Sequence, residues 1–387
     1  MDRNLLSKCR QLFQALSRRQ LVLDCDRVPH RFQQLPLKKI LNWLLVEASV
    51  VAKPGKAWGW PTHLQIEPSA RCNLHCAICP VPTGMHRPTG FMDFQVFQKL
   101  LDEIGAYALL ILLYDWGEPF LNPRIYEMIA YAKERGIKLV SSTNGHIFTQ
   151  VDQADRLIRS GLDTLVVAMD GATQETYAQY RQGGELDSVK EGIRTLVARK
   201  RALNSPTPLI NLRFIVMRHN EREISLLPGL ARSLGVDALT LKTLNPDAAD
   251  KYGDNRASPE ENYGEFLPLD PRYHRFRYTS SGRRLRQSRN PCKHLWNNPA
   301  IHWDGAVCPC TFDYEERYLL GRLGTDTFKD IWQGAAYQRL RRQFRRNWEG
   351  VPLCGDCTYA YLGGNCNRET VGHALFFPQS SPVGAKL

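Results

Sequence analysis

The sequence predicts an α/β fold, with a parallel sheet or partial barrel followed by a small domain organised by metal. Two observations carry this prediction. Six short apolar segments alternate with helical segments between residues 63 and 242, which is the order expected of parallel strands joined by helices. The alternation ends after Lys242, and six of the eleven cysteines then fall in the segment from Cys292 to Cys366.

The expected strands are residues 63–67, 109–114, 138–142, 164–169, 211–217 and 238–242. Residues 109–114 are apolar throughout, as in a strand that is buried on both faces. Helices are expected near residues 94–104 and 125–135. Gly136, Gly161 and Gly235 stand between a helix and the next strand, where a helix commonly ends on a left-handed residue.

We divide the chain into a basic helical extension (1–60), a barrel (61–244), a linker or lid (245–290) and a cysteine-rich domain (291–387). The extension holds eleven Lys or Arg against four Asp or Glu. Two apolar stripes at helical spacing predict two helices there, formed by Leu5, Cys9, Leu12, Phe13 and Leu16, and by Leu37, Ile40, Leu41, Leu44 and Leu45. We favour packing of these helices on the barrel, and an amphipathic surface that contacts anionic lipid is the alternative.

Composition places the protein in the cytoplasm, with attachment to a membrane surface as the alternative. The N-terminal segment 1–20 lacks the apolar core of a signal peptide, and no apolar run is long enough to predict a transmembrane helix. In a reducing compartment, closely spaced cysteines indicate metal binding or catalysis rather than disulfides. The net charge of +12 favours an anionic partner, and of the possible partners we expect no nucleic acid.

Cys72, Cys76 and Cys79 follow the first expected strand directly. Three thiolates at this spacing reach three corners of an iron–sulfur cube and leave one iron open. A structural zinc site is the alternative, but it requires four ligands and no fourth lies nearby.

Polar residues close the next three strands, at the edge where parallel α/β sheets bind ligands. Gly117, Glu118 and Pro119 follow the second strand, Ser142 and Asn144 the third, and Asp170 the fourth. Ordinary turn formation is the alternative for the Asn-Gly and Asp-Gly pairs.

The cysteine loop resembles the cluster loop of the radical S-adenosylmethionine (SAM) superfamily. This resemblance implies a partial (β/α)6 barrel whose [4Fe–4S] cluster binds SAM and cleaves it reductively to a 5′-deoxyadenosyl radical. Trp116-Gly117-Glu118-Pro119 is similar to the family motif that holds the SAM amino group. Arg181 matches an arginine that approaches the SAM carboxylate in several relatives, and an exposed surface arginine is the alternative. The family also implies a low-potential electron donor such as flavodoxin or ferredoxin.

The C-terminal cysteines resemble the SPASM/twitch extension of radical SAM enzymes, which binds auxiliary iron–sulfur clusters. The resemblance implies one auxiliary [4Fe–4S] cluster on Cys292, Cys310, Cys354 and Cys357. Cys308 and Cys366 remain as spare thiols or a replaceable ligand. A zinc site is the alternative, since the spacing of Cys354 and Cys357 also suits zinc.

The function we expect is hydrogen abstraction from a small or lipid-linked biosynthetic intermediate, sugar-like and anionic, leading to oxidation or epimerisation. A peptide-modifying enzyme is one alternative, and a non-catalytic iron–sulfur electron carrier is another. Sulfatase-type relatives carry an acid after the cysteine that Cys310 matches, where this chain has Thr311. Seven arginines and no acid in residues 271–303 are expected to hold an anionic group, whereas the arginines of 339–346 are expected to be solvated.

Overall fold

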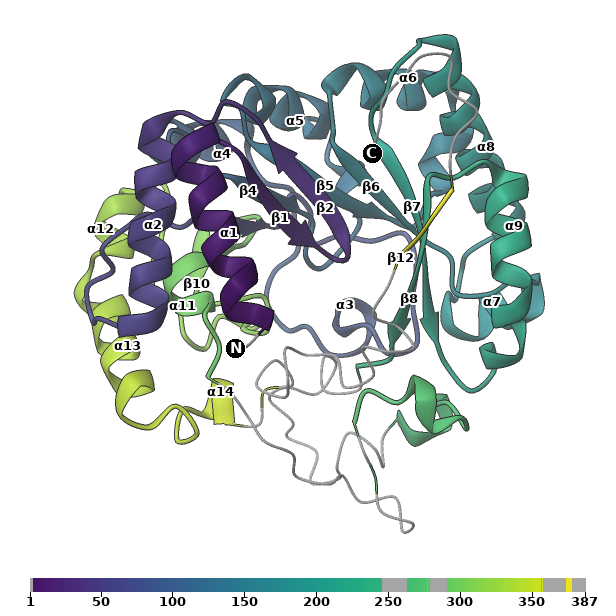
Figure 1. Ribbon diagram of the computed structural model, residues 1–387. Coiled ribbons are helices and arrows are strands. Elements are labelled where there is room, and N and C mark those ends of the chain that lie inside the picture. The colour runs from purple at the N-terminus through teal and green to yellow at the C-terminus, as the bar shows by residue number, and fades with distance from the viewer. Residues whose placement is uncertain are drawn as a thin grey trace.

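The computed structural model describes residues 3–245, 263–276, 278, 291–355, 357 and 374–377, with side chains from residue 10 onward. Six parallel strands form the centre of a curved sheet (Figure 1), in the order in which they occur along the chain. They are β3 (His63–Ile66), β4 (Leu110–Leu113), β5 (Lys138–Thr143), β6 (Thr164–Ala168), β7 (Leu209–Val216) and β8 (Ala238–Thr243). All six expected strands are confirmed, with small shifts at their ends.

Helices cover the outer face of this sheet (Figure 1). They are α4 (Phe94–Ile104), α5 (Ile125–Glu134), α6 (Val151–Ser160), α7 (Gln174–Tyr180), α8 (Leu186–Ala202) and α9 (Leu227–Leu234). Ile111 and Leu113 of β4 belong to the same buried core as these helices, whereas Leu110 packs with Val140 and Val166 on the opposite face. Short turns join the layers: α3 (Pro80–Thr83), η1 (Pro119–Leu121), η2 (His146–Thr149) and η3 (Glu221–Leu226).

The cysteine-rich region extends the barrel sheet. Strand β9 (Ala300–Ile301) pairs in parallel with β3, and β10 (Ala306–Cys308) and β11 (Gly321–Arg322) follow it in antiparallel order. At the other edge, β12 (Ala374–Phe376) pairs antiparallel with β8, so ten of the described strands form one sheet. Helices α11 (His294–Asn297), α12 (Phe328–Trp332), α13 (Ala335–Asn347) and α14 (Pro352–Gly355) complete this region.

The N-terminal extension contains a β-hairpin that the sequence reading missed. Helix α1 (Arg3–Arg18) and helix α2 (Leu37–Ala52) are present as expected, but β1 (Leu21–Cys25) and β2 (Val28–Phe32) lie between them. The hairpin is short and interrupted by charge, so helical periodicity on both sides concealed it.

The hairpin turn anchors the extension to the inner face of the barrel. Asp26 pairs with Arg213 of β7 and Lys242 of β8, and the Arg27 guanidinium donates to the Leu241 carbonyl. Burial would raise the pKa of Asp26, but the charges of Arg213 and Lys242 hold it well below its usual value. The extension is therefore part of the barrel structure.

Two expectations about arginines change. Arg341 of α13 is fully buried, donates to the carbonyls of Leu295 and Trp332, and lies 4.0 Å from the Tyr337 ring centroid, so the expectation that 339–346 is uniformly solvated is wrong. In the 271–303 run, Arg272 pairs with Asp270 at 2.6 Å, an acid just outside that run. Arg277, Arg283, Arg284, Arg286 and Arg289 lie outside the described residues, as does Cys366.

The described part of the linker consists of turns beside the barrel. These are η5 (Gly264–Phe266) and η6 (Pro271–Tyr273). The Arg218 guanidinium after β7 donates to the carbonyls of Gly264 and Leu267, so this part of the linker is fixed to the carboxyl end of the sheet.

Candidate active site

The three cysteines of the first motif gather at the carboxyl end of β3. Cys76 is buried and Cys72 and Cys79 are half-buried, in an apolar cluster with Leu74, Ile78, Tyr180, Met217 and Leu244. Burial is the main cause that raises the pKa of the Cys72 thiol to about 11 and of Cys79 to about 12, and the neighbouring cysteine charges add to it. Thiols in such a place become thiolates only with a cation beside them, which fits an iron–sulfur cluster.

The segment after α7 holds the cysteine loop in place. The His75 amide donates to the Gln182 carbonyl at 2.9 Å, and the Ala77 amide donates to the Tyr180 carbonyl at 3.0 Å. Arg181 places Nη1 3.6 Å from the Cys76 sulfur. These contacts bring a cationic side chain to the cluster loop.

Asp170 fixes the position of Arg181. The carboxylate accepts from Arg181 Nε at 2.7 Å and from the Ile215 amide at 2.7 Å, and the Arg181 side chain is 14% exposed. An exposed surface arginine is therefore wrong for this position. The carboxylate lowers the cost of burying the guanidinium and leaves Nη1 directed at the cysteine loop.

Gly117 allows the end of β4 to touch the cysteine loop. Its φ is +94°, and a Cβ there would lie 2.4 Å from the Ser69 carbonyl oxygen. The next amide, that of Glu118, donates to the Arg71 carbonyl at 2.8 Å, one residue before Cys72. Only glycine combines this backbone conformation with this approach.

The Glu118 carboxylate joins the ends of β4 and β5. It accepts from the Phe120 amide at 3.2 Å, the Thr143 hydroxyl at 3.0 Å and the Asn144 amide at 2.7 Å. Asn144 Nδ2 in turn donates to Asn73 Oδ1 at 2.7 Å, and burial raises the pKa of Glu118 to about 7. Pro119 is buried at the start of η1, and Ser142 is half-buried on β5. All of the predicted SAM contacts thus lie near the carboxyl ends of the parallel strands, and their roles stay predictions.

The four predicted auxiliary ligands line a single cavity. Cys292, Cys310, Cys354 and Cys357 share it with His294, Leu295, Pro309, Phe312, Leu340, Phe344, Trp348 and Leu353. Burial raises the pKa of Cys310 well above its usual value, and the charges of the other three cysteines raise it further. Cys308 is fully buried on β10 and does not line this cavity. Among the described residues, no group of three or more His, Cys, Asp or Glu side chains is arranged to hold a single metal ion.

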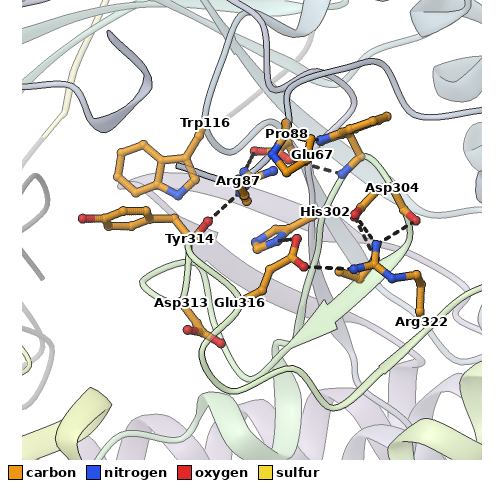
Figure 2. Close-up of polar contacts among 12 residues, drawn as sticks. Glu67, Arg87, Pro88, Trp116, His302, Asp304, Asp313, Tyr314, Glu316 and Arg322 are labelled. Carbon is orange, nitrogen blue, oxygen red and sulfur yellow. Dashed lines mark hydrogen bonds and ion pairs between the residues drawn. The ribbon is translucent and has the colours of Figure 1, made fainter. Parts of the chain in front are cut away.

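A cluster of polar contacts between the barrel and the cysteine-rich region was not anticipated from the sequence (Figure 2). Arg87 donates to Glu67 at 2.5 Å and to the Tyr314 carbonyl at 2.5 Å. His302 bonds Glu316 at 3.1 Å, and Arg322 joins Glu316 to Asp304. The members come from segments that are far apart in the sequence, so no local pattern could reveal them.

The fold and the two cysteine sites define a class of enzymes. Residues 66–221 match the Radical SAM superfamily, and residues 292–358 match SPASM, an iron-sulfur cluster-binding domain. The protein is a radical SAM enzyme with a SPASM domain. It uses SAM and a SAM-binding [4Fe–4S] cluster, and its C-terminal region binds auxiliary iron–sulfur clusters. These matches support iron–sulfur clusters rather than zinc, and an enzyme rather than a non-catalytic carrier.

Known proteins similar to this chain include a cofactor-modifying protein, a synthase and a maturase. It is 26% identical to the "Tungsten-containing aldehyde ferredoxin oxidoreductase cofactor-modifying protein" of Pyrococcus furiosus, over 76% of this chain and 87% of that protein. It is 28% identical to the AdoMet-dependent heme synthase of Methanosarcina barkeri, over 79% of this chain and 91% of that protein. The mycofactocin maturase MftC of Mycobacterium ulcerans is 26% identical, over 79% and 83% respectively.

Solved structures share the fold at low sequence identity. Streptococcus suis SuiB bound to precursor peptide SuiA superposes with a TM-score of 0.56 at 13% identity, covering 87% of this chain and 78% of that one. The structure of anSMEcpe with bound AdoMet gives a TM-score of 0.53 at 16% identity, covering 81% and 91%. These similarities confirm the α/β fold with a partial barrel.

Proposed function

We propose that this enzyme oxidises a small, anionic biosynthetic intermediate and passes one substrate electron to its auxiliary cluster. One observation carries the proposal: Cys292, Cys310, Cys354 and Cys357 line one cavity. A cluster held by four thiolates has no open iron for substrate, and such clusters serve electron transfer. The apolar lining of the cavity suits a buried cluster whose potential is set by its surroundings.

SAM bound at the first cluster supplies the group that takes a hydrogen atom from the substrate. The side chains of this protein bind SAM and orient it. In this proposal Arg181, oriented by Asp170, binds the SAM carboxylate, and Glu118 holds the ends of β4 and β5 together next to the cysteine loop. The apolar cluster around Cys76 keeps water from the thiolates.

Anaerobic reconstitution with SAM, a reductant and deuterium-labelled metabolite pools tests this function. Deuterium transferred into 5′-deoxyadenosine identifies the substrate, and a product two electrons more oxidised than the substrate supports the proposal. Replacing both Cys354 and Cys357 with Ala should keep abortive 5′-deoxyadenosine formation and abolish the oxidised product. Cys308→Ala is the matched control, because Cys308 lies in the same region and outside the cavity. Product formed in D₂O with deuterium on the reacting carbon and no redox change would mean epimerisation instead.

Peptide modification is the second candidate. Its support is the similarity to MftC and to SuiB, whose solved structure holds a precursor peptide. The β1–β2 hairpin gives residues 1–60 some β structure, and its turn is held by Arg213 and Lys242 of the barrel. Label recovered from a peptide pool, and none from a small-molecule pool, would favour this candidate.

We also propose that α1 and α2 rest on an anionic lipid surface, which would give access to a lipid-linked substrate. Leu12, Phe13 and Leu16 of α1 and Leu37, Leu41 and Leu45 of α2 are exposed, with Phe13 at 65% and Leu41 at 59%. Exposed cations lie among them, namely Arg10, Arg18, Arg19 and Lys38. Apolar side chains flanked by cations match the boundary of an anionic bilayer.

A flotation assay with lipid vesicles distinguishes lipid binding by this surface from the alternatives. The protein should float with phosphatidylglycerol vesicles and less with phosphatidylcholine, and Leu41→Glu with Leu45→Glu should abolish flotation. Leu226→Glu is the control, since Leu226 is 57% exposed on η3. A dimer in solution that the double variant dissociates would assign the face to a second copy of the chain. Among the described residues, no helix is both long and apolar enough to cross a membrane.

A further inference from the structure

Two cations stand on the inner face of the barrel, next to the first cysteine site. On β7 and β8, Arg213 and Lys242 alternate with residues of the core that packs on the helices, so their side chains point to the opposite face, into the barrel. Lys242 is the register partner of Ile215, which packs in the apolar cluster around Cys76. Adjacent strands are about 5 Å apart, so Lys242 lies one strand away from that cluster.

The β1–β2 hairpin lies on the inner side of the sheet (Figure 1) and brings a third cation to it. Its two-residue turn consists of Asp26 and Arg27, at φ +54° and +70°. Such turns favour Gly and Asn, because a larger side chain strains this backbone conformation. The Arg27 guanidinium donates to the Leu241 carbonyl of β8. An arginine held in this conformation indicates that its side chain contributes something that glycine cannot supply.

Positive charge exceeds negative charge among these groups. The Asp26 carboxylate pairs with Arg213 and lies 3.5 Å from Lys242 Nζ. Together with Arg27, the two barrel cations carry three positive charges against this one negative charge, an excess of two. Arg275 of the linker adds a further positive charge to the surroundings of Lys242.

Several N–H groups of these cations lack an acceptor. Arg213 is 5% exposed, and its Nε has no hydrogen-bond partner among the described residues. The same holds, within that part of the chain, for Nη2 of Arg27. The Asp26 charge raises the pKa of Lys242, but burial and the charges of the three arginines outweigh it and lower the pKa to about 8. Unsatisfied donors and mutually repelling cations destabilise the folded protein unless an anion joins them.

The barrel interior is accessible at the level of Lys242. Its side chain keeps 35% of its surface exposed. Ser142 and Ile215, which also face inward near the carboxyl ends of their strands, are half-buried. Val140 and Asn211, which lie two and four residues earlier on the same strands, are buried. A small ligand that enters from the carboxyl ends of the strands therefore meets Lys242 beside the cysteine loop.

We propose that Lys242, Arg27 and Arg213 bind a phosphate group of the substrate. The inference rests on the proposed function, because it places an anionic substrate beside the SAM site of that reaction. A phosphate group carries nearly two negative charges at neutral pH, which matches the excess of two positive charges. Its oxygens accept strong hydrogen bonds from guanidinium and ammonium groups. The N-terminal hairpin thus supplies part of the substrate site.

Binding of inorganic phosphate tests this site without substrate. Reconstituted protein with saturating SAM is unfolded thermally under anaerobic conditions, in rising phosphate at constant ionic strength set with chloride. The unfolding temperature should rise with phosphate, since a ligand that binds only the folded protein stabilises it. Lys242→Gln should weaken the apparent phosphate affinity about tenfold, the usual effect of losing one charged hydrogen bond. Asp26→Asn should strengthen it, because the change removes the competing carboxylate.

Lys138→Gln is the matched control. Lys138 is 32% exposed at the opposite, amino end of β5 and pairs with Asp163 at 2.8 Å, so the change removes the same charge from a strand lysine away from the proposed site. Its phosphate affinity should equal that of the unaltered protein.

Three results would overturn the proposal: no response of the unaltered protein to phosphate, unchanged affinity in Lys242→Gln, or weaker affinity in Asp26→Asn. If Lys242→Gln does not fold, Arg27→Gln takes its place with the same expected loss. A substrate that carries no phosphate group would also overturn the proposal. The proposed oxidation fails separately, through an epimerised product, and that failure leaves the phosphate response of these variants unchanged.

Discussion

Replacing Gly117 with Ala should release the cysteine loop. A Cβ at this position would lie 2.4 Å from the Ser69 carbonyl oxygen, 2.9 Å from the Ala70 carbonyl carbon and 2.9 Å from the Arg71 carbonyl oxygen. All three are backbone atoms, so no side chain can rotate away. The φ of +94° adds strain for any residue with a Cβ.

The loss of stability in Gly117→Ala combines two effects. Backbone strain at positive φ is about 1–3 kcal/mol, and overpacking adds about 1–3 kcal/mol. We therefore expect Gly117→Ala to lower the free energy of unfolding by about 2–6 kcal/mol. Gly136 is the matched control, because its φ is +62° and an added Cβ meets nothing within 4 Å. Gly136→Ala should cost about 1–2 kcal/mol from conformation alone.

Two measurements test the loss of stability and the displacement of the cysteine loop. Thermal unfolding of the unreconstituted proteins compares stability, and iron content after anaerobic reconstitution reports the loop. Gly117→Ala should lose about four of about eight irons, because the displaced backbone leads directly to Cys72. Gly136→Ala should keep all of them. Equal unfolding temperatures and equal iron in the two variants would refute the reasoning.

Three further changes have defined outcomes. Replacing Cys72, Cys76 and Cys79 together with Ala should leave about four irons and no SAM cleavage, measured by iron assay and chromatography of 5′-deoxyadenosine. Any remaining cleavage would contradict the site. Burial lowers the pKa of His30 to about 4 from 6.5, so the unfolded chain binds the extra proton and stability falls as pH drops through this interval. His30→Gln should remove up to about 3 kcal/mol of that fall in urea unfolding, and an unchanged pH slope would contradict it. Arg341→Ala should lower the free energy of unfolding by about 3–5 kcal/mol, because it empties the space between Trp332 and Tyr337 and leaves two carbonyls unpaired. Arg342→Ala, on the exposed face of α13, is the control and should have little effect on that free energy.

Local sequence determined the barrel and both cysteine motifs. The strands of the barrel are short segments that contain buried apolar residues, and Gly136, Gly161 and Gly235 take the positive φ that ends a helix. The spacing of Cys72, Cys76 and Cys79 is fixed by one loop, so a single sequence shows the site. The β1–β2 hairpin was concealed because its charged turn is stabilised by Arg213 and Lys242, which are distant from it in the sequence.

The tertiary structure alone decided which polar side chains act together. Glu118 reads as a SAM contact in the sequence, and the fold places its carboxylate on the amides and hydroxyl at two strand ends. Asp115 and Thr311 are 196 residues apart, and they meet because β9 adds to the β3 edge of the barrel sheet. Burial and neighbouring charges then set the protonation of Asp115, and both are properties of the folded surroundings rather than of the residue type.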